Sequence, residues 1–109
     1  LKAAKRPFAR STVNITEAQL DELMAAEYEI FDASEPALRI FVFHYDDAAL
    51  AKPAKVARWI NQSGLVHHAE CTANGGRVVA IGSQSSDPLT DELRQATNDF
   101  MDAFMIGRY

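Results

Sequence analysis

The sequence contains a single cysteine, Cys71, which excludes a disulfide bond within the chain but leaves the redox compartment open. No apolar run approaches the roughly 18 residues that a membrane span requires, so we expect no span within residues 1–109. The small-residue loop at 82–86 has neither a phosphate-loop lysine nor the glycine spacing of a dinucleotide site. We therefore interpret it as an ordinary loop.

Positive charge is scarce beyond the first ten residues. Four of the eleven basic residues lie within residues 1–10 and all fifteen acidic residues follow, so residues 11–109 carry a net charge of −8. A body this acidic argues against binding the phosphate backbone of a nucleic acid. Residues 1–11 lack apolar periodicity and are predicted to be a flexible basic tail or linker. Because the sequence starts with Leu1 rather than Met, a removed signal, an upstream lipid anchor or a membrane helix is compatible with it.

The remaining residues, 12–109, have the length and the 48% hydrophobic content of one globular domain. Thr16 and Gln19 have capping-box spacing and predict a helix that ends near Glu27. Short strands are expected at 13–15 and 28–31. The segment 38–45 is apolar at both alternating sets of positions, which is typical of a central strand covered on both faces.

A second helix is expected from Asp46 or Asp47 to about Gln62, with Gly64 as its stop. Pro53 lies inside this range, so either a new helix begins at Pro53 or one helix is kinked there. The Asp46–Asp47 pair is explained by its place at the start of this helix.

Residues 65–82 are predicted to form a hairpin around Asn74-Gly75-Gly76. We favour a three-residue loop, because it places Ala69, Cys71, Val79 and Ile81 on one face. Asp87-Pro88 is expected to start a last helix that ends before Gly107. The order α-β-β-α-β-β-α defines an α+β fold, with about three helices on a largely antiparallel sheet of about four strands.

One cluster of possible metal ligands is present, formed by His44, His67, His68, Glu70 and Cys71. Strand alternation sends His67 and Cys71 to one face and His68 and Glu70 to the other, whereas a tetrahedral site needs three or four convergent ligands. Cys71 lies among small apolar residues, where a thiol is a poor nucleophile. We therefore expect no metal, no cofactor and no catalytic residue here.

The last helix carries an apolar arc wider than one core-facing stripe. Methionine-rich surfaces adapt to partners, and exposed apolar patches mark interaction sites. The alternative is that this helix lies deep and buries most of its circumference. The arc is formed by Phe100, Met101, Phe104, Met105 and Tyr109.

The order of elements resembles that of small α+β domains of unknown function in secreted bacterial lipoproteins. The matching pieces are a Leu/Met helical stripe, an aromatic strand, an Ala/Lys-rich helix, a glycine-marked hairpin with a hydrophobic return strand, and a last helix ending near F-x-G, at residues 20–24, 41–47, 48–57, 74–82 and 104–107. The resemblance implies an extracytoplasmic, non-enzymatic domain.

We therefore expect a non-catalytic binding or accessory module that engages a protein partner or a second copy of itself, through the last helix or an exposed sheet edge. One alternative is a small metal-binding or thiol-dependent enzyme using His44, His67, His68 and Cys71. Another is a structural domain of a longer chain. Convergence of those four side chains in one pocket would favour the enzyme.

Overall fold

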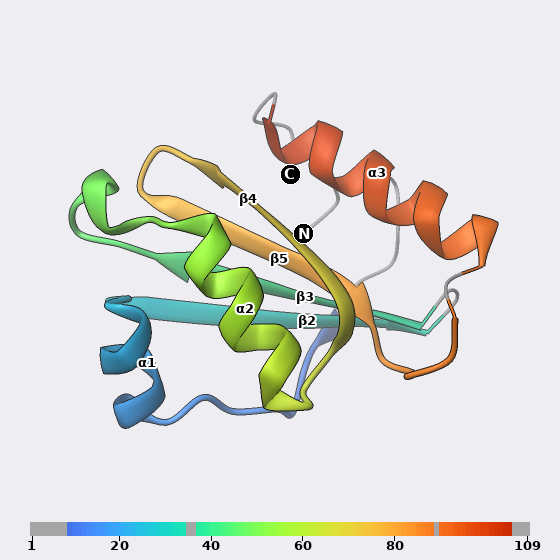
Figure 1. Cartoon of the computed structure of the whole chain (residues 1–109), viewed down its shortest axis with the longest axis horizontal. Helices are drawn as coiled ribbons and strands as arrows, with labels where there is room; N and C mark the ends of the chain where they lie inside the picture. Colours follow the sequence, from blue (N-terminus) through green and yellow to red (C-terminus); the bar gives the residue numbers. More distant parts are fainter. Residues whose placement is uncertain (1–8, 35–36, 89, 106–109) are drawn as a thin grey trace.

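The structure is a computed structural model that describes residues 9–34, 37–88 and 90–105, with side chains omitted at Ser34 and at 103–105. The strands form one antiparallel sheet in the order β1-β2-β3-β5-β4 (Figure 1). The predicted α+β class is confirmed, but the sheet has five strands rather than about four. The elements are β1 (Ala9–Arg10), α1 (Glu17–Leu23), β2 (Glu27–Ser34), β3 (Ala37–His44), the 3₁₀ helix η2 (Ala48–Leu50), α2 (Pro53–Ser63), β4 (His67–Asn74), β5 (Arg77–Ser83) and α3 (Asp91–Met105).

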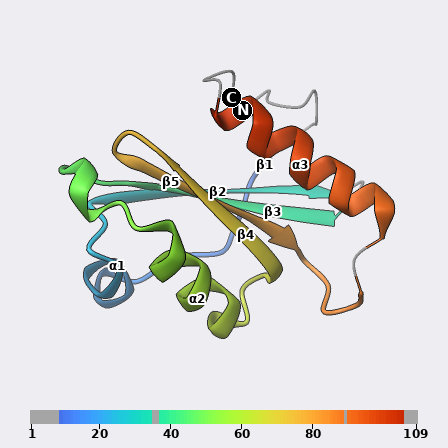
Figure 2. The ribbon, with the colours of Figure 1, turned by 45° about the horizontal axis from the view of Figure 1, so that its top comes forward.

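The sheet separates two layers of helices. Helices α1 and α2 lie on one face, and α3 lies on the other (Figures 1 and 2). None of the helices in the described part of the chain has the length and apolar character that crossing a membrane requires.

Strand β3 lies between β2 and β5 and is buried on both faces, as predicted. Phe41 and Phe43 point to the α1/α2 side, while Ile40 and Val42 point to the α3 side; each is at most 2% exposed. Because successive strand residues alternate between faces, an apolar β3 supplies both cores. The core on the α1/α2 side contains Ile15, Leu23, Ile30, Phe41, Phe43, Tyr45, Val56, Ile60, Val66, Val78 and Ala80, and the core on the α3 side contains Ala33, Leu38, Ile40, Val42, Val79, Ile81, Ala96 and Phe100.

The additional strand, β1, lies within the segment expected to be a tail. Arg10 pairs with Phe31, stands over its ring at 5.6 Å from the centroid, and approaches Glu29 at 3.5 Å. The strand expected at 13–15 is absent. Its backbone groups bond to side chains instead, since the N–H of Ile15 donates to Tyr28 Oη at 3.1 Å.

Helix α1 begins as predicted but ends earlier. Thr16 and Gln19 form both bonds of the capping box. Met24, with φ of 62°, adopts the left-handed conformation and ends the helix three residues before Glu27. The N–H of Ala25 donates to Leu20 O at 3.0 Å, which satisfies a carbonyl at the helix end.

Pro53 starts a new helix, which decides between the two alternatives for this region. The separate turn η2 is capped by Asp47, whose Oδ1 accepts from the N–H of Ala49 at 2.9 Å. Pro53 occupies the first turn of α2, where a missing N–H costs nothing. Gly64, with φ of 77°, ends α2 as expected.

The β4–β5 hairpin has a two-residue loop, so the preferred three-residue register is wrong. Asn74 pairs with Arg77, Thr72 with Val79, and Cys71 with Ala80. Gly75 has a positive φ of 63°, which confirms the expected left-handed residue in the turn. Gly76 lies against the backbone of Tyr45, and the N–H of Tyr45 donates to Gly76 O at 2.7 Å. The loop therefore contacts the residue that follows β3.

Helix α3 also begins later than predicted. It starts at Asp91, and the N–H of Leu93 donates to Thr90 Oγ1 at 3.2 Å, so Thr90 replaces Asp87 as the cap. Serine side chains hold the preceding loop instead, since the N–H of Asp87 donates to Ser85 Oγ at 3.1 Å.

We predict that Gly76→Ala destabilises the fold more than Gly75→Ala. A Cβ at position 76 would lie 2.8 Å from the backbone oxygen of Tyr45, which cannot move without disturbing the end of β3. At position 75 there is open space, and only the left-handed conformation is penalised, by about 1–2 kcal/mol. Urea unfolding of both variants measures the difference. Equal losses would show that the hairpin does not depend on its approach to Tyr45.

Candidate functional site

A hollow in the described surface runs between β4 and α3. It consists of two adjoining hollows of about 730 Å³ and 300 Å³, which share Glu70 and Asn98 in their walls. We call it the β4–α3 groove. It is lined by His68, Glu70, Cys71 and Thr72 from β4 and by Arg94, Gln95, Thr97, Asn98, Met101 and Asp102 from α3.

The two ends of the groove differ in charge. His68 and Arg94 line the smaller hollow, near the starts of β4 and α3. Asp102 and Thr72 line the larger hollow, further along both elements. Glu70 lies between them. Within the described residues, Arg94, Glu70 and Asp102 form no ion pair with one another, so their charges remain available to an occupant.

Strand β4 is the edge of the sheet, because β5 is its only partner strand among the described residues. One side chain covers part of this edge. Asn61 on α2 donates from Nδ2 to Ala69 O at 3.3 Å, and its Oδ1 accepts from the N–H of Ala69 at 2.9 Å. A primary amide has the donor and acceptor of a peptide group. Asn61 therefore replaces a neighbouring strand at one residue.

The outward groups of β4 continue beyond Ala69. In an antiparallel pair, residues alternate between bonding the partner strand and facing away from it. Because Ala69 faces away from β5, Cys71 and Ala73 do so too, while Thr72 faces β5 opposite Val79. The backbone N–H and C=O groups of Cys71 and Ala73 thus form an edge beside the β4–α3 groove that no other described residue pairs with.

A β-bulge shapes the start of β4. His67 pairs with Ser83 and Glu70 with Ile81, so the register shifts between them, and His68 has a positive φ of 56°. The regular alternation expected for His67, His68, Glu70 and Cys71 is therefore interrupted. His68 lines the groove, and its Nε2 donates to the backbone oxygen of Asp87 at 3.1 Å.

Two of the possible metal ligands, His44 and His67, lie far apart. His44 pairs with Arg77 and His67 with Ser83, which places them six residues apart along β5, about 20 Å. His44 Nε2 instead lies 3.0 Å from Glu29 Oε1. No group of three or more metal-binding side chains occurs among the described residues. The convergence that would favour the enzyme is not observed there.

The thiol of Cys71 points away from the groove side chains and packs against the α1/α2 core. Burial, with a smaller contribution from the negative charge of Glu70, raises the pKa of Cys71 to about 12. Burial also raises the pKa of Tyr45, whose Oη has no hydrogen-bond partner among the described atoms. The buried thiol of Cys71 is therefore protonated at neutral pH and is a poor nucleophile.

The apolar arc of the last helix is divided by its surroundings. Phe100 is 1% exposed and belongs to the core on the α3 side. Met101 is partly buried, packs against that core and lines the groove. The side chains of Phe104 and Met105, and Tyr109 as a whole, lie outside the described residues.

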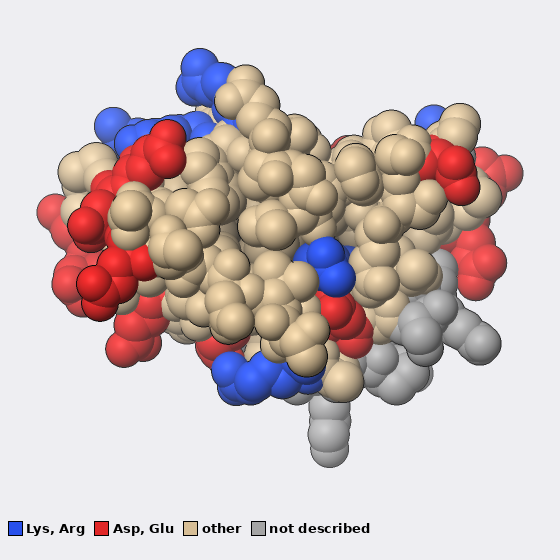
Figure 3. All heavy atoms as spheres, turned by 90° about the horizontal axis from the view of Figure 1, so that it is seen from below, with Lys and Arg blue, Asp and Glu red and all other residues tan. Residues whose placement is uncertain are grey.

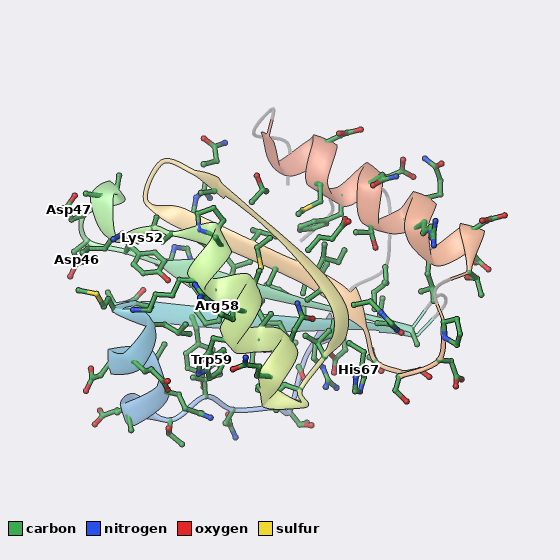
Figure 4. All side chains as sticks on the ribbon, in the orientation of Figure 1. Asp46, Asp47, Lys52, Arg58, Trp59 and His67 are labelled. Atoms are coloured by element: carbon green, nitrogen blue, oxygen red, sulfur yellow. The ribbon has the colours of Figure 1, made fainter. Side chains whose placement is uncertain are left out.

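The Asp46–Asp47 pair and Trp59 lie apart from the groove (Figure 4). Asp46 and Asp47 lie at the turn before η2, at the left of the view and away from His67. Trp59 is partly buried between α2 and α1, and its Nε1 donates to Glu22 Oε2 at 3.2 Å. Acidic side chains gather at the α1 end of the molecule (Figure 3), where Glu17, Asp21 and Glu22 are exposed.

Sequence reasoning missed most of the groove. Arg94, Asn98, Met101 and Asp102 recur at spacings of three and four residues, which places them on one side of α3, next to its buried stripe. That periodicity was the available signal. The sequence around Asn61 gave no signal of its role, because its side chain bonds the backbone of Ala69 on another element.

The chain matches no known protein family, no curated protein and no solved structure.

We predict that Cys71 is almost unreactive in the folded protein. At pH 8, a pKa of about 12 rather than 9.0 lowers the thiolate fraction by about 1,000-fold. Reaction with a disulfide reagent should therefore be at least about 100-fold slower in buffer than in about 8 M urea, in which the protein is unfolded. Comparable rates in both conditions would show an accessible thiolate.

The same burial predicts a pH dependence of stability. Because the folded pKa of Cys71 lies above the unfolded value, the folded state binds more protons between about pH 9 and 12, and the free energy of unfolding falls as pH rises through that range. Urea melts at pH 8 and pH 10 measure this fall. Cys71→Ala should show a smaller fall than the wild type, and an identical fall would contradict the assignment.

Phe100→Ala should cost about 3–5 kcal/mol of folding stability, as truncation of a buried aromatic residue does. Met101→Ala should cost clearly less, because Met101 is only partly buried. Denaturant melts of both variants decide this. Equal losses would mean that the groove side of α3 is part of the core.

Proposed function

We propose that this protein is a non-catalytic binding module whose ligand is an extended peptide segment of a partner protein. The segment pairs with the outer edge of β4 and places alternate side chains in the β4–α3 groove. The observation that carries the proposal is the coincidence of a strand edge, at Cys71 and Ala73, that the described part of the chain leaves unpaired, with a groove walled by a helix.

Strand addition uses both features together. Backbone hydrogen bonds to the edge hold an added peptide, and pockets for its alternate side chains give specificity. In an antiparallel pair, opposite residues point to the same face. Peptide residues opposite Glu70 and Thr72 therefore point to the α3 side, into the groove. Residues opposite Cys71 point to the α2 side.

Asn61 limits where the ligand can pair. It already satisfies the outward groups of Ala69, so an added strand gains new backbone bonds at Cys71 and Ala73 without breaking existing ones. A short free edge of this kind also restrains uncontrolled edge-to-edge association, which is the common hazard of an edge strand.

A second copy of the chain is a weaker occupant than a peptide. Two β4 edges related by a two-fold axis would share only the outward groups of Cys71 and Ala73, and stable interfaces bury about 1,200–2,000 Å². Such pairing would also bring the Glu70 and Asp102 carboxylates of two acidic molecules closer together. Like charges oppose association.

Two further features support a module without catalysis. The Cys71 thiol is buried with a raised pKa, and His44 lies far along the sheet from His67. The resemblance of the element order to domains of secreted lipoproteins agrees with the same proposal and implies an extracytoplasmic location.

The test is a selection of displayed random ten-residue peptides against the folded protein. Enriched peptides should slow amide hydrogen exchange at Cys71 and Ala73, because both N–H groups become hydrogen-bonded. Ala73→Pro removes one of these donors and should weaken binding by about three- to ten-fold. Ala73→Val has a similar size, keeps the N–H, and should bind like the wild type.

Three outcomes would contradict the proposal. The selection fails to enrich any peptide, the enriched peptides protect amides elsewhere, or Ala73→Pro binds as well as Ala73→Val. Sedimentation of the unliganded protein at the same concentrations tests the rival occupant. A dimer that Ala73→Pro dissociates would show that the edge binds a second copy instead.

A further inference from the structure

From the charges of the groove we infer the chemistry of the ligand: the bound segment carries a lysine or arginine whose side chain enters the larger hollow between Glu70 and Asp102. This inference rests on the proposed strand addition and adds the residue class that gives it specificity. It depends on where the charged side chains of β4 and α3 lie along the groove.

The larger hollow is open, polar and acidic. Glu70 from β4 and Asp102 from α3 line it, together with Gln95 and Asn98 of the same helix. Both carboxylates are exposed and form no ion pair with another described residue. The side-chain amide oxygens of Gln95 and Asn98 are additional acceptors, although Gln95 also donates to Asp99 Oδ1 at 2.8 Å.

The position of the basic residue follows from the strand register. The peptide residue opposite Thr72 points to the α3 side, as Thr72 does, and emerges beside the hollow that Thr72 and Asp102 line. At the other end of the groove, the guanidinium of Arg94 would repel a cation. A basic side chain is therefore favoured at one end only, which fixes the register of the peptide.

The net charge of the molecule acts in the same direction. A chain that carries −8 over residues 11–109 attracts basic segments and accelerates their encounter at low salt. Acidic segments are repelled, so the preferred ligand differs in charge from this protein itself. The same charges oppose the acidic body of a second copy, residues 11–109, and favour a basic segment.

The experiment uses the peptide selection with two charge variants. The double variant Glu70→Gln, Asp102→Asn removes both carboxylates from the groove. The matched control Asp91→Asn, Glu92→Gln removes two charges from the exposed start of the same helix, outside the groove. We expect the wild type and the control to enrich peptides with lysine or arginine at one fixed position. The groove variant should lose this enrichment.

One enriched peptide is then resynthesised with norleucine in place of its basic residue. Wild type should bind the original about five-fold more tightly in 20 mM NaCl, with little difference left in 0.5 M NaCl, because exposed ion pairs are weak and are screened by salt. The groove variant should bind both peptides equally at either salt concentration.

The results separate the two levels of the proposal. If peptides slow exchange at Cys71 and Ala73 but show no fixed basic position, or if the control variant loses the preference as fully as the groove variant, the inference about charge is wrong and strand addition stands. If no enriched peptide slows exchange at those two amides, strand addition itself is wrong, and the basic preference has no site.

Discussion

The structure depends on one strand that is apolar on both faces. Phe41 and Phe43 require a layer of helices on one side of β3, and Ile40 and Val42 require another layer on the opposite side. Two neighbouring strands, β2 and β5, complete its hydrogen bonds. Because α3 covers the second face, β4 is left at the margin with a helix beside it. The groove and the free edge are thus geometric results of burying β3 twice.

Much of this arrangement could be predicted from the sequence, wherever the cause was local. The capping box at Thr16 and the central place of residues 38–45 were predicted from neighbouring residues, and a new helix at Pro53 was one of the two alternatives given for that region. The errors arose where distant segments decide the outcome. The hairpin loop is one residue shorter than expected, and its Gly76 contacts Tyr45, a residue about 30 positions earlier in the chain. The strand at Ala9–Arg10 forms because Arg10 contacts residues of β2.

The candidate site was harder to predict than the fold, because its parts come from separate elements. The sequence indicated an interaction role for the last helix and for a sheet edge, but it placed the emphasis on apolar residues such as Phe100, which is buried in the core. The groove is instead lined mainly by polar residues on the side of α3 next to its buried stripe. The bulge at His68 and the amide of Asn61 depend on β5 and α2, and no pattern along β4 alone indicates either.

The two cores share no side chain, since the sheet lies between them and consecutive residues of β3 and β5 alternate between sides. Free-energy changes from substitutions in separate, non-contacting groups of residues add. Variation on the α3 side can therefore accumulate during evolution without compensating changes under α1 and α2. A protein divided in this way can diversify what it recognises while one half of its interior keeps the scaffold stable.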